Sequence, residues 1–141
     1  MEKVTEILAR KQPHFRKISP TSTISDALGR MSTQNSDYLI VTDENENFLG
    51  LLTEHDVATK TIFTNRPLAK TRVKEVMNKS LPFANLNDTV EQCMRVMRRH
   101  HVRYLPVFNN LDFIGVISID DILEEVVSHG ADFFEGDEKI L

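Results

Sequence analysis

Cysteine, tryptophan and long apolar runs are scarce or missing in this 141-residue chain. Its single cysteine, Cys93, can form no internal disulfide, which favours a reducing, cytoplasmic setting. No apolar run approaches the roughly 18 residues that a membrane span requires. The first lysine is not followed by the apolar segment of a signal peptide. The sequence therefore predicts a cytoplasmic protein that does not enter a membrane.

A surplus of basic charge is absent too. The chain has 17 lysine and arginine residues against 21 acidic residues, which gives a formal net charge of −4. Because nucleic-acid-binding proteins are more often basic, this balance disfavours nucleic acid as a partner. The charge is uneven, however, since the stretch from Lys60 to Lys79 has Glu75 as its only acidic residue. Nucleic-acid binding through this basic stretch therefore stays as an alternative.

The motifs of common enzyme classes are also missing. The chain has no Gly-x-Gly-x-x-Gly or Gly-x-x-x-x-Gly-Lys loop to cradle a phosphate, and no nucleophile can be placed beside a base. The adjacent residues His100 and His101 do not share a helix face, which disfavours a metal site. Cys93 lies beside apolar residues at helical spacing, as is typical of a buried structural thiol. These features predict a protein that is not an enzyme and has no metal or catalytic cofactor.

The chain does contain an internal repeat. With an offset of 66 residues (89 − 23), Thr23-Ile24 matches Thr89-Val90, and with an offset of 65 (115 − 50) Gly50 matches Gly115. Units of about 60 residues bury little surface alone and gain most by packing on each other. The polar residues that recur are Thr53 and Asp56 in the first copy and Ser118 and Asp121 in the second. Because most other matches are apolar, these polar pairs are the candidate functional residues.

Each copy predicts the same order of elements, β-α-β-β-α, and hence an α/β (α+β) fold. An extended lead-in precedes a helix with capping-box spacing at Thr23 or Thr89. Two short apolar strands joined by a polar turn form a hairpin, and a last helix opens at Thr53 or Ser118. The predicted divisions are an N-terminal helix at 1–14, a first repeat at 15–64, a linker at 65–79, a second repeat at 80–129 and a C-terminal tail at 130–141.

Two sequence elements resemble a known family. Gly50-Leu-Leu-Thr-Glu-His-Asp56 and Gly115-Val-Ile-Ser-Ile-Asp-Asp121 resemble the motif of the cystathionine β-synthase (CBS) domain, and the segment from His101 to Val107 resembles another of its elements. The resemblance covers roughly residues 13–128. It implies two CBS repeats packed as a pseudo-twofold Bateman module of the stand-alone bacterial type. It also implies clefts between the repeats that bind AMP, ADP, ATP, NAD or S-adenosylmethionine.

The resemblance further implies which residues bind the ligand. Asp56 and Asp121 would bind ribose hydroxyls, Thr53 and Ser118 would lie on the phosphate side, and Arg103 would border the adenine. On the residues alone, the basic cluster around Arg103 is either a solvated helix end or places Arg103 or a neighbouring arginine against a ligand phosphate. The remaining residues would border the adenine or line the cleft: Lys17, Ile18, Ser36, Asp37, Tyr38, Phe83, Ala84, Val102, Tyr104 and Pro106. Because an aromatic ring stacks on adenine better than a lysine stem does, Phe83 favours tighter binding at Asp121 than at Asp56.

The recurring polar pairs also have a purely structural interpretation. Thr53-x-x-Asp56 and Ser118-x-x-Asp121 have the spacing of capping boxes, in which the carboxylate folds back on the start of its own helix. The chemistry suits ribose as well, because an ionised carboxylate can accept both hydroxyls of a vicinal diol. The two interpretations overlap, since the hydroxyl can cap the helix while the aspartate points outward.

The sequence as a whole predicts a non-enzymatic regulatory module. An adenine nucleotide would be its regulatory ligand, and binding would shift the populations of two arrangements that an unidentified partner protein distinguishes. The module would act as a homodimer, partly to cover the apolar stripe of Val4, Ile7 and Leu8. The alternatives are an interaction or assembly module with vestigial clefts and the nucleic-acid binder described above.

Overall fold

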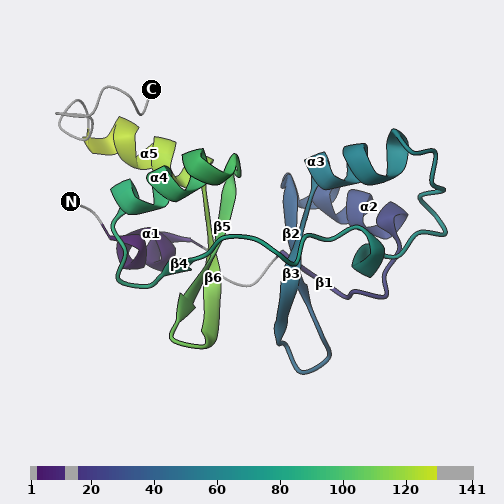
Figure 1. Cartoon of the computed structure of the whole chain (residues 1–141), viewed down its shortest axis with the longest axis horizontal. Coiled ribbons are helices and arrows are strands. Elements are labelled where there is room, and N and C mark those ends of the chain that lie inside the picture. The colour runs from purple at the N-terminus through teal and green to yellow at the C-terminus, as the bar shows by residue number, and fades with distance from the viewer. Residues whose placement is uncertain (1–2, 12–15, 130–141) are drawn as a thin grey trace. The chain divides into compact units, whose positions relative to one another are not determined.

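The computed structural model describes residues 3–11 and 16–129, without the side chains of residues 128 and 129. The predicted tail at 130–141 lies outside the described residues, as do the ends of the predicted N-terminal helix. The chain forms two compact units (Figure 1). We call His14–Leu81 the repeat-1 unit, and Met1–Pro13 together with Pro82–Leu141 the repeat-2 unit.

Both units have the predicted order of elements around a three-stranded sheet. The repeat-1 unit contains β1 (Lys17–Ile18), α2 (Ile24–Gln34), β2 (Tyr38–Thr42), β3 (Phe48–Thr53), α3 (Glu54–Val57), the π-helical stretch η1 (Ala58–Ile62) and the 3-10 turn η2 (Val73–Glu75). The repeat-2 unit contains α1 (Val4–Arg10), β4 (Ala84–Asn85), α4 (Val90–His100), β5 (Tyr104–Asn109), β6 (Asp112–Ser118) and α5 (Ile119–His129). The predicted α+β class with a twofold β-α-β-β-α repeat is thereby confirmed.

The two sheets have the same topology. β1 runs parallel to β2 and β2 antiparallel to β3, and β4, β5 and β6 repeat this order. The first helix of each repeat begins at the predicted cap, because the Oγ1 atoms of Thr23 and Thr89 each accept a backbone N–H of the first turn, both at 3.1 Å. The same helices are followed by the C-cap residues Asn35 and His101, both in the left-handed conformation.

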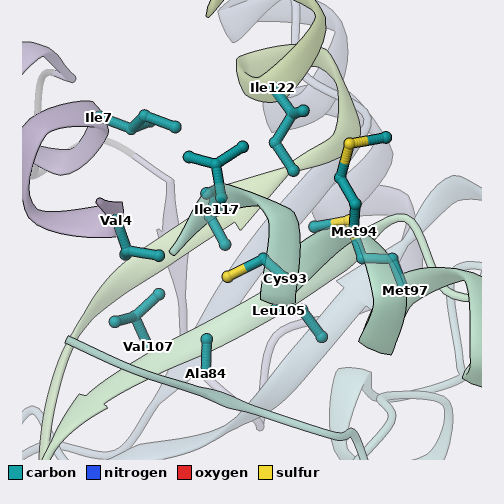
Figure 2. Close-up of a cluster of buried hydrophobic side chains, with 11 residues drawn as sticks. Val4, Ile7, Ala84, Cys93, Met94, Met97, Leu105, Val107, Ile117 and Ile122 are labelled. Atoms are coloured by element: carbon teal, nitrogen blue, oxygen red, sulfur yellow. The ribbon is translucent and has the colours of Figure 1, made fainter. Parts of the chain in front are cut away.

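Each sheet buries one face against its own helices. In the repeat-2 unit, apolar residues of α1, α4, α5 and the strands pack together in one cluster (Figure 2). Val4 and Ile7 of α1 belong to this core and are 0% and 3% exposed. This burial corrects one expectation: the apolar stripe near the N-terminus is covered within its own chain, so it is not a surface that a dimer must cover.

A further pair of matching segments extends the repeat beyond the residues aligned above. We call these two segments, residues 3–8 and 72–77, the lead-in segments. With an offset of 69 (72 − 3), the segment from Lys3 to Leu8, KVTEIL, matches the segment from Arg72 to Met77, RVKEVM. Lys3 forms an antiparallel bridge with Thr89, and Arg72 forms one with Thr23. Each lead-in therefore meets the start of the first helix of the unit in which it packs.

The segments at 3–8 and 72–77 each pack on one repeat, and this packing decides which residues can reach each candidate site. The backbone N–H of Val4 donates to Asp88 at 3.1 Å, and that of Val73 donates to Ser22 at 2.8 Å. The segment that opens the chain thus packs with the second repeat, and the segment between the repeats packs with the first. The residues at 65–79 are therefore part of a folded unit as well as the connection between the repeats.

Candidate functional site

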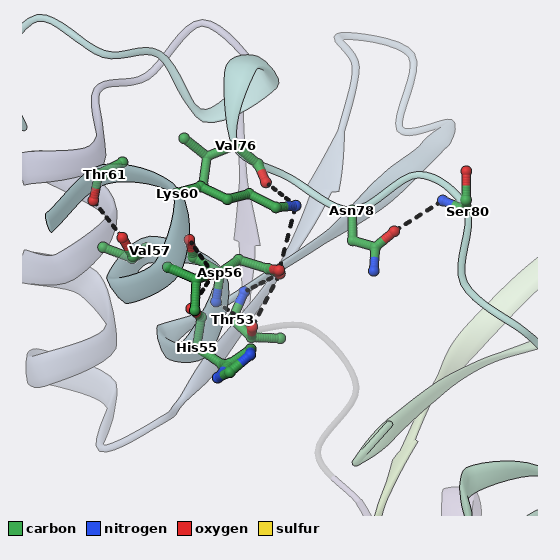
Figure 3. Close-up of polar contacts among 10 residues, drawn as sticks. Thr53, His55, Asp56, Val57, Lys60, Thr61, Val76, Asn78 and Ser80 are labelled. Carbon is green, nitrogen blue, oxygen red and sulfur yellow. Dashed lines mark hydrogen bonds and ion pairs between the residues drawn. The ribbon is translucent and has the colours of Figure 1, made fainter. Parts of the chain in front are cut away.

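The last strand of each sheet ends where a helix begins, and the recurring polar residues lie at this junction. In the repeat-1 unit, the Oγ1 of Thr53 accepts a hydrogen bond from the backbone N–H of Asp56 at 3.0 Å. The Oδ2 of Asp56 accepts in return from the backbone N–H of Thr53 at 3.3 Å and from its hydroxyl at 3.0 Å. The capping box is thus formed, and it holds Asp56 at 8% exposure (Figure 3).

The repeat-2 unit has the same arrangement. The Oγ of Ser118 accepts from the backbone N–H of Asp121 at 3.1 Å, and the Oδ2 of Asp121 accepts from the backbone N–H of Ser118 at 2.8 Å. Among the described residues, the Oδ1 of Asp121 forms no hydrogen bond. Both carboxylates therefore cap their helices. The carboxylate of Asp121 also keeps one oxygen, Oδ1, as an acceptor for a ligand hydroxyl.

The start of β2, the first strand of the hairpin, brings further predicted residues to the junction in the repeat-1 unit. The backbone N–H of Glu54 donates to the carbonyl of Asp37 at 3.0 Å, and Tyr38 lies opposite Thr53 in the antiparallel register. The stretch at 36–38 and the stretch at 53–56 are therefore neighbours, as a shared site requires.

The equivalent residues meet in the repeat-2 unit. The backbone N–H of Ile119 donates to the carbonyl of Arg103 at 2.9 Å, and Tyr104 lies opposite Ser118. The side chain of Arg103 is 66% exposed, with its Nη2 4.0 Å from the Oδ1 of Asp120. Arg103 therefore stands at the start of α5 with its guanidinium in solvent.

Two further contacts fix Tyr38. The hydroxyl of Ser36 donates to the carbonyl of Tyr38 at 2.8 Å, so this predicted side chain serves the backbone. The guanidinium carbon of Arg16 lies 4.9 Å from the centre of the Tyr38 ring, within the range of a cation–π contact. Arg16 was missed in the sequence, where nothing in its spacing distinguishes it.

Four predicted residues lie in or beside strands β1 and β4, and they have different surroundings. Ile18 and Ala84 are core residues, each 2% exposed. The Nζ of Lys17 donates to the Oε1 of Glu46 in the hairpin at 2.8 Å, and this bond lowers the pKa of Glu46 below its ordinary value. In the repeat-1 unit, the lysine stem predicted to border an adenine is thus held by an ion pair.

Aromatic residues take the corresponding place in the repeat-2 unit. Phe83, which is 56% exposed, makes an edge-on contact with Phe108 at 5.7 Å between ring centres, and Phe108 makes a similar contact with Phe113. Pro106 is buried in β5, and Val102 is a partly buried residue at the rim of the core. Phe83 therefore has a largely exposed ring, whereas Val102 and Pro106 serve mainly the packing.

Each candidate carboxylate also has a lysine beside it. In the repeat-1 unit, the Nζ of Lys60 lies 3.4 Å from the Oδ1 of Asp56 and donates to the carbonyl of Val76 at 3.0 Å (Figure 3). Lys60 follows Asp56 by four residues, a spacing at which helical side chains meet.

The lysine of the repeat-2 unit comes from the other end of the chain. The Nζ of Lys11 donates to the Oδ2 of Asp121 at 2.8 Å and to the carbonyl of Val116 at 2.7 Å. The neighbouring Arg10 forms an ion pair with Glu125 on the next turn of α5. The sequence did not reveal either cation, because both lie outside the segments that repeat at offsets of 66 and 65.

Half of the basic side chains from Lys60 to Lys79 form contacts within their own unit. The Nη2 of Arg66 lies 2.5 Å from the Oε1 of Glu75, and the Nη1 of Arg72 donates to the carbonyl of Thr21 at 2.9 Å. With Lys60 held as above, three of the six basic side chains stabilise the fold. This arrangement weakens the case for a continuous nucleic-acid surface.

The rest of the described chain adds no obvious chemistry. Residues 3–11 and 16–129 contain no group of three or more histidine, cysteine or acidic residues placed to hold a metal. Cys93 is buried in the core, as predicted, and burial raises the pKa of its thiol to about 12. None of the helices in these ranges combines the length and apolar character needed to cross a membrane.

Comparison with known proteins identifies the family. The family model of the CBS domain matches residues 4–61 and 73–128, so each match starts at a lead-in segment. The chain therefore belongs to the CBS-domain family and is a pair of CBS domains.

Relatives of this pair occur alone and within larger proteins. The CBS domain-containing protein YhcV of Bacillus subtilis is 29% identical over 112 residues, which cover 79% of each chain. The CBS domain-containing protein CBSCBSPB1 of Arabidopsis thaliana is 31% identical over 111 residues, and this chain spans about a fifth of its length. A homoserine O-acetyltransferase of Methanobrevibacter ruminantium is 32% identical over 113 residues, 22% of that enzyme.

Solved structures share the fold over most of the chain. A CBS-domain-containing protein from Agrobacterium tumefaciens has a TM-score of 0.80 at 27% identity, covering 87% of this chain and 98% of its own. A hexameric CBS-CP12 protein from bloom-forming cyanobacteria has a TM-score of 0.76 at 27% identity, covering 98% of this chain and 80% of its own.

Proposed function

We propose that this CBS-domain pair is a non-enzymatic regulatory module that binds an adenine nucleotide at the junctions of Thr53 with Asp56 and Ser118 with Asp121. The main support is that, in both units, a carboxylate held by a capping box lies at the start of a helix, next to a strand that begins with a tyrosine. A carboxylate fixed in this way is ready to accept ribose hydroxyls without a cost in side-chain freedom.

Binding would act through a shift in populations. A ligand held by its ribose at one of these junctions favours whichever arrangement of the chain fits it best, and a partner protein responds to the difference. The size of the shift is limited by the ligand's difference in affinity for the two arrangements. AMP, ADP, ATP, NAD and S-adenosylmethionine all carry the adenosine group that this mode of binding requires.

Thermal unfolding in the presence of these ligands tests the proposal. A ligand present at about 100 times its dissociation constant adds roughly 2.7 kcal/mol to stability, which is a visible rise in melting temperature. We expect at least one adenine nucleotide to raise the melting temperature and GTP at the same concentration to raise it less. If no adenosine-containing ligand has an effect, the alternative of an assembly module with unused junctions is favoured instead.

Substitution of the two carboxylates shows where the ligand binds. Asp121→Asn and Asp56→Asn keep an oxygen that can cap the helix but remove the charge. Loss of a charge-assisted hydrogen bond costs about 1.5–3 kcal/mol, roughly 10- to 150-fold in affinity. We expect the larger effect from Asp121→Asn, because the exposed ring of Phe83 lies in that unit. Asp26→Asn is a matched control, since Asp26 also follows a helix cap by three residues but belongs to α2, and its backbone N–H donates to Thr23 and not to a junction residue.

Self-association is the second part of the proposal. Leu123 and Val127 of α5 lie four residues apart and are 44% and 83% exposed, so they form an apolar stripe that water covers poorly. The hexameric CBS-CP12 protein shows that a relative of this fold assembles. We expect a homodimer, which light scattering would report as twice the monomer mass of 16.2 kDa. A single species of monomer mass at all micromolar concentrations would contradict it.

A further inference from the structure

The two junctions obtain the same chemical group from different places in the sequence. Lys60 and Lys11 each direct Nζ at a candidate carboxylate while donating to a backbone carbonyl. The two lysines do not occupy equivalent positions in the two repeats. The repeat equivalent of Lys60 is Glu125 (60 + 65), and the lead-in equivalent of Lys11 is Ser80 (11 + 69). The contact of a lysine Nζ with the candidate carboxylate is therefore formed in both units, by residues that are not repeat equivalents.

The replacement of lysine by Glu125 changes the charge at the repeat-2 junction. Asp121 and Glu125 lie four residues apart on α5, a spacing at which two carboxylates repel. Their side chains are 16% and 7% exposed, so solvent screens them little. Lys11 and Arg10 each offset one of these charges. Without the end of α1, this junction would be strongly negative.

A negative junction would disfavour the phosphorylated ligands among those proposed above. A nucleoside phosphate group carries about 1.5 to 2 negative charges near neutral pH. At the same separation, two unit charges near a protein surface interact several times more strongly than they do in bulk water. One uncompensated carboxylate beside the ribose would therefore weaken binding of a phosphorylated ligand measurably, while a neutral nucleoside would be affected little.

We propose that Lys11 and Lys60 are equivalent specificity-determining residues, which make the junctions at Asp121 and Asp56 selective for phosphorylated nucleosides over adenosine. The inference rests on the proposed function and adds that α1 completes the repeat-2 site. Lys11 occupies the Oδ2 of Asp121 and leaves Oδ1 for a ribose hydroxyl. Lys60 faces the Oδ1 of Asp56, whose Oδ2 is engaged by Thr53.

Titration calorimetry with AMP and adenosine tests this inference, because the two ligands differ only in the phosphate group. Lys11→Met and Lys60→Met keep the length of the apolar stem and remove the charge. Lys3→Met is the matched control for Lys11→Met: it makes the same change in net charge in the same segment, at an exposed residue outside the junction. Lys70→Met, also at an exposed lysine, is the control for Lys60→Met. Lys11→Arg tests whether charge alone restores binding.

We expect Lys11→Met to weaken one AMP-binding step by at least about tenfold, the effect of 1.4 kcal/mol, and to change adenosine affinity by less than about threefold. Lys60→Met should do the same to the other step, and Lys11→Arg should recover most of the AMP affinity. Circular dichroism melts of each variant show whether it is folded at the titration temperature.

Two results would overturn the inference alone. In the first, AMP and adenosine lose affinity equally in the lysine variants, which would make the lysines supports of the carboxylates only. In the second, the variants bind AMP as the parent does. If the parent protein binds neither AMP nor adenosine nor any other adenine nucleotide, the proposed function fails as well.

Discussion

A Cβ atom at Gly50 would lie 2.6 Å from the carbonyl oxygen of Asn78. This approach is closer than real Cβ contacts allow, and the obstacle is backbone. The carbonyl of Asn78 cannot easily move, because it accepts from the backbone N–H of Leu51 at 3.1 Å while the N–H of Asn78 donates to Leu51 at 2.8 Å. Gly50, part of the recurring motif, is therefore required by the packing of the segment at 72–79 on β3.

We predict that Gly50→Ala destabilises the protein by about 1–3 kcal/mol, the usual cost of forcing an extra methyl group into a filled space. Gly29→Ala is the matched control, because no heavy atom lies within 4 Å of its added Cβ. In the interior of α2, that change should stabilise by about 0.5–1 kcal/mol. Urea unfolding measures both, and equal effects of the two substitutions would show that the contact at Gly50 is unimportant.

The second prediction concerns Cys93. Burial raises the pKa of its thiol from the ordinary value of 9.0 to about 12, with a smaller contribution from the charge of Asp88. Since the thiolate is the reactive form, the folded protein should react slowly with iodoacetamide at pH 8. The rate should rise steeply across the urea unfolding transition. Rapid alkylation of the native protein, at the rate of a free thiol, would contradict the burial of this side chain.

The same shift has a consequence for stability at high pH. Between about pH 9 and pH 12, the unfolded chain has lost the thiol proton while the folded chain keeps it, so the unfolded state binds fewer protons. Stability therefore falls as pH rises, by up to about 1.4 kcal/mol per unit from this group. Comparison with Cys93→Ala isolates the contribution. The variant should lose stability less steeply between pH 9 and pH 10.5, whatever its stability at pH 7.

Local rules in the sequence were enough to predict the repeat and its elements. Thr23 and Thr89 cap their helices because a threonine hydroxyl at this position accepts a backbone N–H of the first turn that has no partner within the helix. The motifs after Gly50 and Gly115 also predicted where the carboxylates lie, since a short strand followed by a capping box fixes them by local geometry. The part of the site that depends on neighbours in sequence was therefore predictable.

The two cations at the end of α1 could not be predicted in this way. Lys11 and Asp121 are 110 residues apart, and no periodicity connects them. A signal was present nevertheless, because the lead-in segments KVTEIL and RVKEVM match at an offset of 69. That offset differs from the offset of 66 in the first helices, so an alignment begun at Thr23 misses it. Even a complete alignment would have placed Ser80 opposite Lys11, since the lysines are not repeat equivalents.

The third prediction concerns the ion pair of Arg10 with Glu125. Glu125 is 6% exposed, so removal of the guanidinium weakens the compensation of a buried carboxylate. Because the side chain of Arg10 is itself 53% exposed, solvent offsets part of the loss. We expect Arg10→Met to destabilise the protein by about 1–3 kcal/mol. In a Glu125→Gln background, the same substitution should cost much less, because no charge is left to compensate. Equal costs in both backgrounds, measured by urea unfolding, would show that Arg10 acts through packing alone.

The last prediction separates a regulatory module from an enzyme. The described residues include no group of three or more histidine, cysteine or acidic side chains placed to hold a metal, and burial raises the pKa of the Cys93 thiol to about 12. At each junction one carboxylate oxygen caps its own helix and the other is the one proposed to accept a ribose hydroxyl, so neither is left to activate water once a nucleotide is bound. We therefore expect bound ATP, NAD and AMP to be recovered intact after long incubation with stoichiometric protein. Chromatography of the nucleotides measures this directly, with Asp121→Asn as the control for contaminating activity. Product that increases with the amount of repurified parent protein but not with the variant would contradict the prediction, because it would place a reaction at the junction of Ser118 with Asp121.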